Sequence, residues 1–175
     1  MKCIIGLGNP GKQYENNYHN LGVIFSQLLL AKYEERIISK QEKDSCTIYK
    51  FAQFYLIIPK IYMNLSYKAL WPVVSLYKIS LSNILVMHDE LMKKAGILNL
   101  KHGGGNAGHN GLRSITEHIG NDYFRLQIGI DHPKNLGNLM SVSDYVLSNI
   151  QDVDFYKKIF EQKGFDMIEK WIEKE

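Results

Sequence analysis

Short apolar segments alternate with segments of helical periodicity along this chain, and that alternation constrains the fold more than any other feature. Apolar runs predict strands at residues 2–7, 46–52, 54–59, 83–87, 97–101 and 124–130. Helical spacing predicts helices at residues 20–33, 66–78, 110–119 and 152–174. Pro72 should start, kink or interrupt the second helix, and Gly164 should break the last one.

Strands joined through helices usually pair in parallel, because the crossover needs the length that a helix provides. The two strands on either side of Gln53 are close enough in sequence to form an antiparallel hairpin instead. We therefore expect an α/β protein with a single three-layer domain over residues 1–175. Its central sheet should be mixed but mostly parallel, with helices on both faces.

Cysteine content and charge narrow the functional classes. Cys3 and Cys46 are too few for a disulfide framework and form no CxxC pair, so a reducing, cytoplasmic setting is expected. No apolar stretch has the length of a signal peptide or of a bilayer span, so no membrane partner is expected. Residues 1–143 hold 16 Lys or Arg against 10 Asp or Glu, whereas residues 144–175 hold 5 against 8. This basic body is compatible with a polyanionic partner but does not require one.

The first motif, residues 6–11, matches the G-x-G-x-x-G pattern of dinucleotide-binding folds. In those folds the glycines lead directly into a helix that faces a pyrophosphate, but here Pro10 and a polar run at residues 12–17 intervene. A tight turn at a strand end, which projects Asn9, explains these residues better than a cofactor site.

His19 follows that turn, just before the first predicted helix, and Asp89 follows a predicted central strand. If the first strand runs parallel to that one, Asn9, His19 and Asp89 meet at one sheet edge, where α/β proteins place their sites. These side chains suit hydrolysis of an ester by water. Histidine takes the proton of the water, aspartate fixes the histidine tautomer, and asparagine donates to the carbonyl oxygen. No serine lies in a G-x-S-x-G motif.

A second motif is the glycine-rich segment 103–108, which leads to Asn110, a natural helix cap. Its backbone N–H groups could face an anion or a carbonyl oxygen, with Lys101 and Arg113 beside them, or it could be only a tight turn. A metal site is a further alternative, made by His102 with His109, or by residues 88–90, although no zinc motif supports it. We expect no metal.

A third motif, Tyr62-Met63-Asn64, follows an apolar strand and Pro59. These residues could cap a helix and fill the core. Alternatively, an aromatic ring and a thioether beside an asparagine could form a groove for an extended peptide or a terminal base.

In this order and spacing, these motifs resemble the bacterial peptidyl-tRNA hydrolase family, over most of residues 3–132. The segments that carry the resemblance are residues 6–11, Tyr14, 19–20, 62–66, 88–91, 103–112, 124–126 and 128–130. The resemblance implies a phosphorylase/hydrolase-like fold and a monomeric enzyme without metal or cofactor. Such an enzyme cuts the ester between a peptide and the 3′ ribose of tRNA, and so recycles peptidyl-tRNA released during translation.

By motif position, the resemblance makes His19 the general base, Asp89 its partner and Asn9 the contact to the substrate carbonyl. Asn9 would also help to distinguish blocked from free aminoacyl ends. The residues implied in binding the acceptor end of peptidyl-tRNA or in lining its groove are Tyr14, Tyr62, Met63, Asn64, Lys101, His109 and Asn110.

The chain departs from the family pattern at Gln127, where an arginine implicated in tRNA phosphate contact is common. Lys101 alone remains of that basic pair, and Lys93 with Lys94 could offset the loss. One rival reading is an RNA-binding module of the same fold without hydrolase activity, but retention of the base and its carboxylate argues for catalysis. A nucleotide-binding oxidoreductase would need an affinity for NAD(P), and the position of Pro10 argues against such a site.

Overall fold

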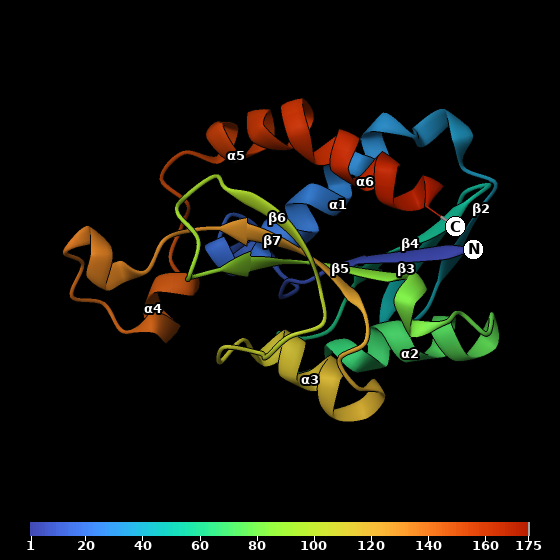
Figure 1. Cartoon of the computed structure of the whole chain (residues 1–175), viewed down its shortest axis with the longest axis horizontal. Coiled ribbons are helices and arrows are strands. Elements are labelled where there is room, and N and C mark those ends of the chain that lie inside the picture. Colours follow the sequence, from blue (N-terminus) through green and yellow to red (C-terminus); the bar gives the residue numbers. More distant parts are fainter. Residues whose placement is uncertain (175) are drawn as a thin grey trace.

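One seven-stranded sheet organises the molecule in the computed structural model, which describes residues 1–174 (Figure 1). The strand order is β2-β3-β4-β1-β5-β7-β6. The strands in chain order are β1 Lys2–Gly6, β2 Ser39–Glu42, β3 Cys46–Lys50, β4 Phe54–Pro59, β5 Ile84–Glu90, β6 Leu98–His102 and β7 Phe124–Gly129. The expected mixed sheet is therefore confirmed.

The centre of the sheet is parallel. β1 pairs in parallel with β4 and β5, and β5 pairs in parallel with β7. The antiparallel pairs lie outside this centre: β3 forms the predicted hairpin with β4, β2 extends it, and β6 pairs with β7. The parallel strands β4, β1, β5 and β7 thus bring their carboxyl ends to the same edge.

Helices cover both faces of the sheet, which gives the three layers expected (Figure 1). One face carries α1 Leu21–Lys32, α5 Val153–Ile159 and α6 Phe165–Glu173. The opposite face carries α2 Ser66–Leu76 and α3 Asn110–Ile119, while the short α4 Val142–Val146 lies at the side of the molecule. None of the helices in residues 1–174 combines the length and the apolar character needed to cross a bilayer.

Alternation along the strands builds two cores. In β1, Ile4 joins the core under α1, α5 and α6, whereas Cys3 and Ile5 join the core under α2 and α3. Successive side chains of a strand point to opposite faces, so a strand covered on both sides is apolar throughout. This explains the continuous apolar runs in the sequence, and it confirms that Cys3 is buried within a strand.

The first helix lies unusually close to the sheet because two glycines face each other. A Cβ atom at Gly6 of β1 would overlap the carbonyl oxygen of Gly22 in α1, and a Cβ at Gly22 would overlap that of Met87 in β5. The backbones therefore touch where any other residue would hold them apart. This contact sets the position of the residues that immediately precede α1.

Two local expectations differ from the structure. α2 runs through Pro72 without interruption, and the exposed side chains there let water reach the carbonyl that loses its N–H partner. The last helix continues through Gly164 in a π-helical turn, Phe160–Gly164, that joins α5 to α6. Gly164 leaves room for the ring of Phe160, which packs on Phe25 at 4.1 Å between centroids. The role of this glycine is packing rather than termination.

Candidate active site

The predicted chemistry-bearing residues gather at the carboxyl edge of the parallel strands. Asn9 follows β1, Met63 and Asn64 follow β4, and Asp89 is the penultimate residue of β5. Asp89 thus lies within its strand rather than just beyond it, and the parallel pairing of β1 with β5 brings Asn9 to the same edge. His19 lies in the 3-10 turn Tyr18–Asn20 that leads into α1.

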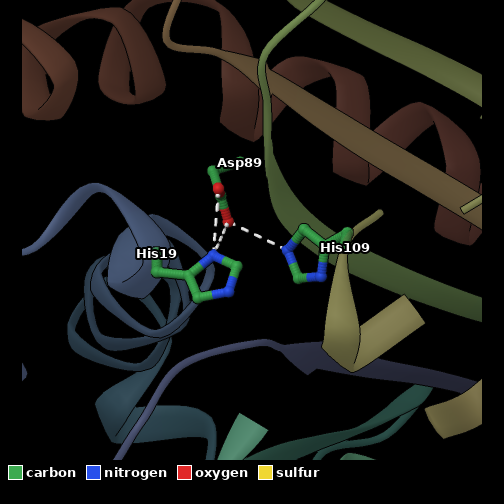
Figure 2. A group of neighbouring side chains, drawn as sticks. All are labelled: His19, Asp89 and His109. Carbon is green, nitrogen blue, oxygen red and sulfur yellow. Dashed lines mark hydrogen bonds and ion pairs between the residues drawn. The ribbon is translucent and has the colours of Figure 1, made fainter. Parts of the chain in front are cut away.

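At the centre of the site, one carboxylate holds two imidazoles (Figure 2). The Nδ1 atom of His19 lies 2.9 Å from Oδ1 and 3.0 Å from Oδ2 of Asp89. The Nε2 atom of His109 lies 2.9 Å from the same Oδ1. All three residues are buried, with exposures of 8% for His19, 3% for Asp89 and 9% for His109.

The backbone determines the tautomer of His109. Its Nδ1 accepts hydrogen bonds from the backbone N–H groups of Gly111 and Leu112, at 3.2 and 3.4 Å. The proton of the neutral ring must therefore be on Nε2, which donates it to Asp89. His109 is also the N-cap of α3, so the expectation that Asn110 caps this helix was wrong. Nδ1 of His109 accepts the N–H groups at the start of the helix, which the side-chain oxygen of Asn110 was expected to accept.

The tautomer of His19 follows from its carboxylate partner. An ionised carboxylate only accepts hydrogen bonds, so His19 donates from Nδ1 and its Nε2 keeps a lone pair. Burial of the ring lowers the pKa of His19, but the charge of Asp89 and the hydrogen bond to it raise that pKa by more, so the net direction is upward. The Nε2 atom of His19 has no protein partner within residues 1–174. His19 also lines the cleft that is described below.

Burial and neighbours also set the charges of the other groups. Burial favours the neutral form of Asp89, but His19 and then His109 outweigh it and hold the pKa of the carboxyl well below its usual range. Burial lowers the pKa of His109. The neighbouring His88 is buried against His109, and burial followed by that contact lowers its pKa to about 3. At neutral pH the site therefore contains one carboxylate, with His88 and His109 neutral beside it.

Asn9 is held in a defined orientation. Its backbone N–H and C=O bond to the side chain of Asn20, both at 2.9 Å. Its side-chain Oδ1 accepts the backbone N–H of Met63 at 2.8 Å. The amide Nδ2 is therefore the end left to donate to another molecule. Because Asn9 lines the same cleft as His19, that donor is available near the imidazole.

A cleft of about 600 Å³ joins these residues to the solvent. Its polar lining includes Asn64 and Asn110 beside the central cluster. Its apolar lining is formed by Met63, Leu91, Val142, Val146 and Leu147. The apolar lining is thus suited to apolar groups, and the polar groups of the central cluster are suited to a carbonyl and a water molecule.

Most of the residues predicted to bind the substrate share this cleft. Tyr62, Met63, Asn64, His109 and Asn110 all line it. Tyr14 lies beside it, with its ring edge-to-face on that of Tyr62 at 6.5 Å between centroids. Lys101 is the exception, because it is exposed at the end of β6, over Gly104, and does not line the cleft.

The part of the cleft lining contributed by α4 was not predicted from the sequence. Val142, Val146 and the following Leu147 line the cleft, although no helix was expected there. A signal was available, since Ser141 precedes Asp144 by three residues and caps the helix by accepting its backbone N–H. The edge strand β2 was missed for a different reason: its Ser-Lys-Gln-Glu sequence is polar throughout, as an edge allows.

Gln127, the departure from the family pattern, is buried in a polar row across three strands. Its Nε2 donates to Glu90 at 2.8 Å, and its Oε1 accepts from Asn99 at 2.6 Å. Both ends of the amide are thus satisfied inside the protein. This neutral side chain offers no charge to an external phosphate.

The central cluster has the composition of a metal site but not its protonation. His19, Asp89 and His109 each offer a ligand atom within 4.8 Å of the others. A metal needs the lone pair of a neutral imidazole. On the side that faces Asp89, however, His109 carries its proton, because two N–H groups occupy Nδ1. His102 was considered with His109 as a metal site from the sequence. Its Nε2 instead lies 3.0 Å from Oδ1 of Asp122. The arrangement suits proton transfer better than metal binding.

Comparison with known proteins identifies close relatives. The family model described as peptidyl-tRNA hydrolase matches residues 3–175. A peptidyl-tRNA hydrolase of Francisella tularensis subsp. tularensis (strain SCHU S4) is 46% identical over 154 residues, which cover 85% of this chain and 78% of the relative. That of Rickettsia bellii is 41% identical over 159 residues, 89% of this chain and 84% of the relative. The solved structure of the Acinetobacter baumannii peptidyl-tRNA hydrolase superposes with a TM-score of 0.79 at 32% identity, covering 98% of this chain and 94% of that one.

Proposed function

The chain belongs to the peptidyl-tRNA hydrolase family, a family of ester hydrolases, and on that premise we propose that it cleaves peptidyl-tRNA with His19 as general base. The bond cut is the ester between the peptide, or an N-blocked amino acid, and the 3′ ribose of tRNA. The reaction returns tRNA from peptidyl-tRNA released during translation. The protein acts as a single-domain monomer in the cytoplasm.

The proposed first step is attack by water. His19 Nε2 takes a proton from a water molecule, whose oxygen bonds to the carbonyl carbon of the ester. Asp89 accepts from Nδ1 at 2.9 and 3.0 Å, and so stabilises the imidazolium that forms. Asn9 donates from Nδ2 to the carbonyl oxygen as negative charge develops on it.

Collapse of the tetrahedral intermediate completes the reaction. The carbon–oxygen bond to the ribose breaks, and the leaving 3′ oxygen takes the proton held by His19. The products are tRNA with a free 3′ hydroxyl and a peptide with a carboxylic acid, which releases its proton to the solvent and becomes a carboxylate. His19 returns to its neutral form, and each proton is accounted for.

The proposed binding roles follow the two sides of the cleft. Asn64, Asn110, Tyr62 and Tyr14 contact the acceptor end and the peptide backbone. The peptide side chains contact the apolar lining of the cleft, formed by Met63, Leu91, Val142, Val146 and Leu147. Lys101, outside the cleft, contacts a phosphate further along the tRNA.

One observation carries the proposal: His19 lines the cleft, its Nδ1 is held by a buried, ionised carboxylate, and its Nε2 has no partner among residues 1–174. A protein that only binds RNA does not need this arrangement. It is the geometry that a general base requires.

Incubation with N-acetyl-aminoacyl-tRNA and with its unblocked counterpart tests the proposal, with release of the acyl group as readout. The wild-type protein should cleave the blocked form selectively, and His19→Ala should not. His132→Ala is the matched control, because His132 is a histidine outside the cleft. Binding of tRNA without release of the acyl group would favour an RNA-binding module and overturn the proposal.

A further inference from the structure

We propose that His109 is a positioning residue of this reaction: a permanently neutral donor that holds one oxygen of Asp89 and thereby regulates how strongly that carboxylate holds His19. The inference deepens the proposed function and rests on it. In the cleft, His109 was expected only to line the groove. Its contacts assign it a role that acts through Asp89.

The first argument is that His109 cannot easily change its protonation state. Protonation would place a hydrogen on Nδ1, directly against the backbone N–H groups of Gly111 and Leu112. Those groups form the amino terminus of α3, where the partial positive charge of the helix also opposes a cation. His109 therefore stays neutral while the neighbouring His19, at 4.5 Å between ring centroids, gains and loses its proton.

The second argument concerns how Asp89 divides its hydrogen bonds. Oδ1 accepts from both imidazoles, whereas Oδ2 accepts from His19 alone. The donor on His109 withdraws negative charge from the carboxylate and fixes its rotation about the Cβ–Cγ bond. Without that donor, Asp89 would interact more strongly with the imidazolium of His19 but in a less defined orientation. The present arrangement keeps the base neutral closer to physiological pH.

The other charged or titratable groups near Asp89 and His109 make their hydrogen bonds to other atoms. On β5, His88 donates to the backbone oxygen of Asp89 at 2.7 Å, and Glu90 accepts from Gln127. Arg125 of β7 bonds to the carbonyls of Gly104 and Gly105, and Tyr156 of α5 donates to that of Gly129. None of these side chains bonds to a carboxylate oxygen of Asp89. Within residues 1–174, His109 is thus the one side chain besides His19 that donates to the carboxylate of Asp89.

The test uses His109→Asn with His132→Asn as its matched control. Asparagine is a good N-cap, so its oxygen can still accept the N–H groups at the start of α3, but its shorter side chain loses the donor to Asp89. His132 is likewise a histidine cap, accepting from Lys134 at 3.2 Å, but it lies outside the cleft. The two variants make the same chemical change in the two places.

The readout is the dependence of kcat/KM on pH. Activity requires neutral His19, so it rises with pH through the pKa of that residue. In His109→Asn, the acid limb should move to higher pH by about 0.5 unit, roughly a threefold change in proton affinity. The loss of activity should consequently be greater at pH 6 than at pH 8, with kcat reduced about 10-fold and KM little changed. His132→Asn should follow the wild-type profile.

Two outcomes overturn the inference. One is a profile of His109→Asn that falls equally at every pH or through KM alone, which would mean a merely structural role. The other is found in the wild-type protein, by NMR of the imidazole nitrogens. His109 should remain the Nε2–H tautomer from pH 5.5 to 8.5 while His19 titrates, and titration of His109 in that range would contradict its permanent neutrality.

The NMR measurement also separates this inference from the proposed function. If the wild-type protein cleaves no blocked aminoacyl-tRNA, the proposed function fails. The His109→Asn variant should still raise the midpoint at which His19 titrates. If cleavage is normal and that midpoint does not move, the role of His109 alone is rejected.

Discussion

The centre and the rim of the cleft are built in opposite ways. In the centre, Asp89 and His109 are almost fully buried, and both carboxylate oxygens of Asp89 and both ring nitrogens of His109 have hydrogen-bond partners. At the rim, Tyr62 is 54% exposed, and Val142 and Leu147 are each 41% exposed. The contrast teaches that packing fixes the geometry of the chemistry, while the contacts to substrate are left open until the substrate arrives.

If this contrast is correct, the largest effect should come from removing the base at the centre. His19→Ala should lower kcat by about 10²- to 10⁴-fold, the usual contribution of general-base catalysis, because the variant loses the proposed base. Affinity for tRNA should be largely retained, since the rim is intact. Single-turnover kinetics with a parallel binding assay measure the two effects, and near-normal turnover would remove His19 from its role.

Protonation of the same imidazole should produce the next largest effect. Asp89 raises the pKa of His19 above the ordinary value, so the inactive imidazolium persists to higher pH than for a free histidine. Below that pKa, kcat/KM should fall about 10-fold for each pH unit. A pH–rate profile with salt held constant measures this. A flat profile through the acid range would show that the rate does not depend on the charge of the centre.

A substitution at the rim should change affinity rather than the chemical step. Asn64→Ala removes an exposed amide from the cleft lining and leaves the central hydrogen bonds unchanged. We expect KM to rise about 10-fold, the equivalent of one good hydrogen bond, with kcat changed by no more than about 2-fold. Steady-state kinetics separate the two constants. A fall in kcat equal to that of His19→Ala would break the division between centre and rim.

A smaller effect is expected outside the cleft. Lys101→Ala should weaken tRNA binding a few-fold and reduce the slope of log affinity against log salt by about 0.7 to 0.9, the contribution of one phosphate contact. Equilibrium binding at several salt concentrations measures that slope. Lys68→Ala, on the exposed side of α2, is a control for loss of a positive charge elsewhere. An unchanged slope for Lys101→Ala would exclude the contact.

The smallest effect should come from Leu139→Ser. This side chain is fully exposed and does not line the cleft, so stability should change by less than about 0.5 kcal/mol. Thermal unfolding and kcat/KM should both match the wild-type protein. A clear loss of activity would mean that the segment before α4 takes part in substrate binding, and the rim would then be wider than the cleft indicates.

The same division explains what could be predicted from the sequence. The parallel centre of the sheet and the meeting of Asn9, His19 and Asp89 followed from apolar strands that end in polar residues at one edge. The bond of His109 to Asp89 could not be predicted, because it depends on where the start of α3 lies relative to the end of β5. α4 was not predicted because the helix is short. Its apolar residues could be recognised as part of the site only once the cleft that they line was known.

Gly6 and Gly22 carry no functional group, but because their backbones touch, both positions should be decisive for turnover. His19 lies three residues before Gly22, so the spacing between helix and strand is passed on directly to the imidazole and its carboxylate. A single added methyl group there would separate a proton donor from its acceptor without touching either. A screen for inactive variants should therefore recover these glycines beside the acid and the base, even when the altered protein remains folded.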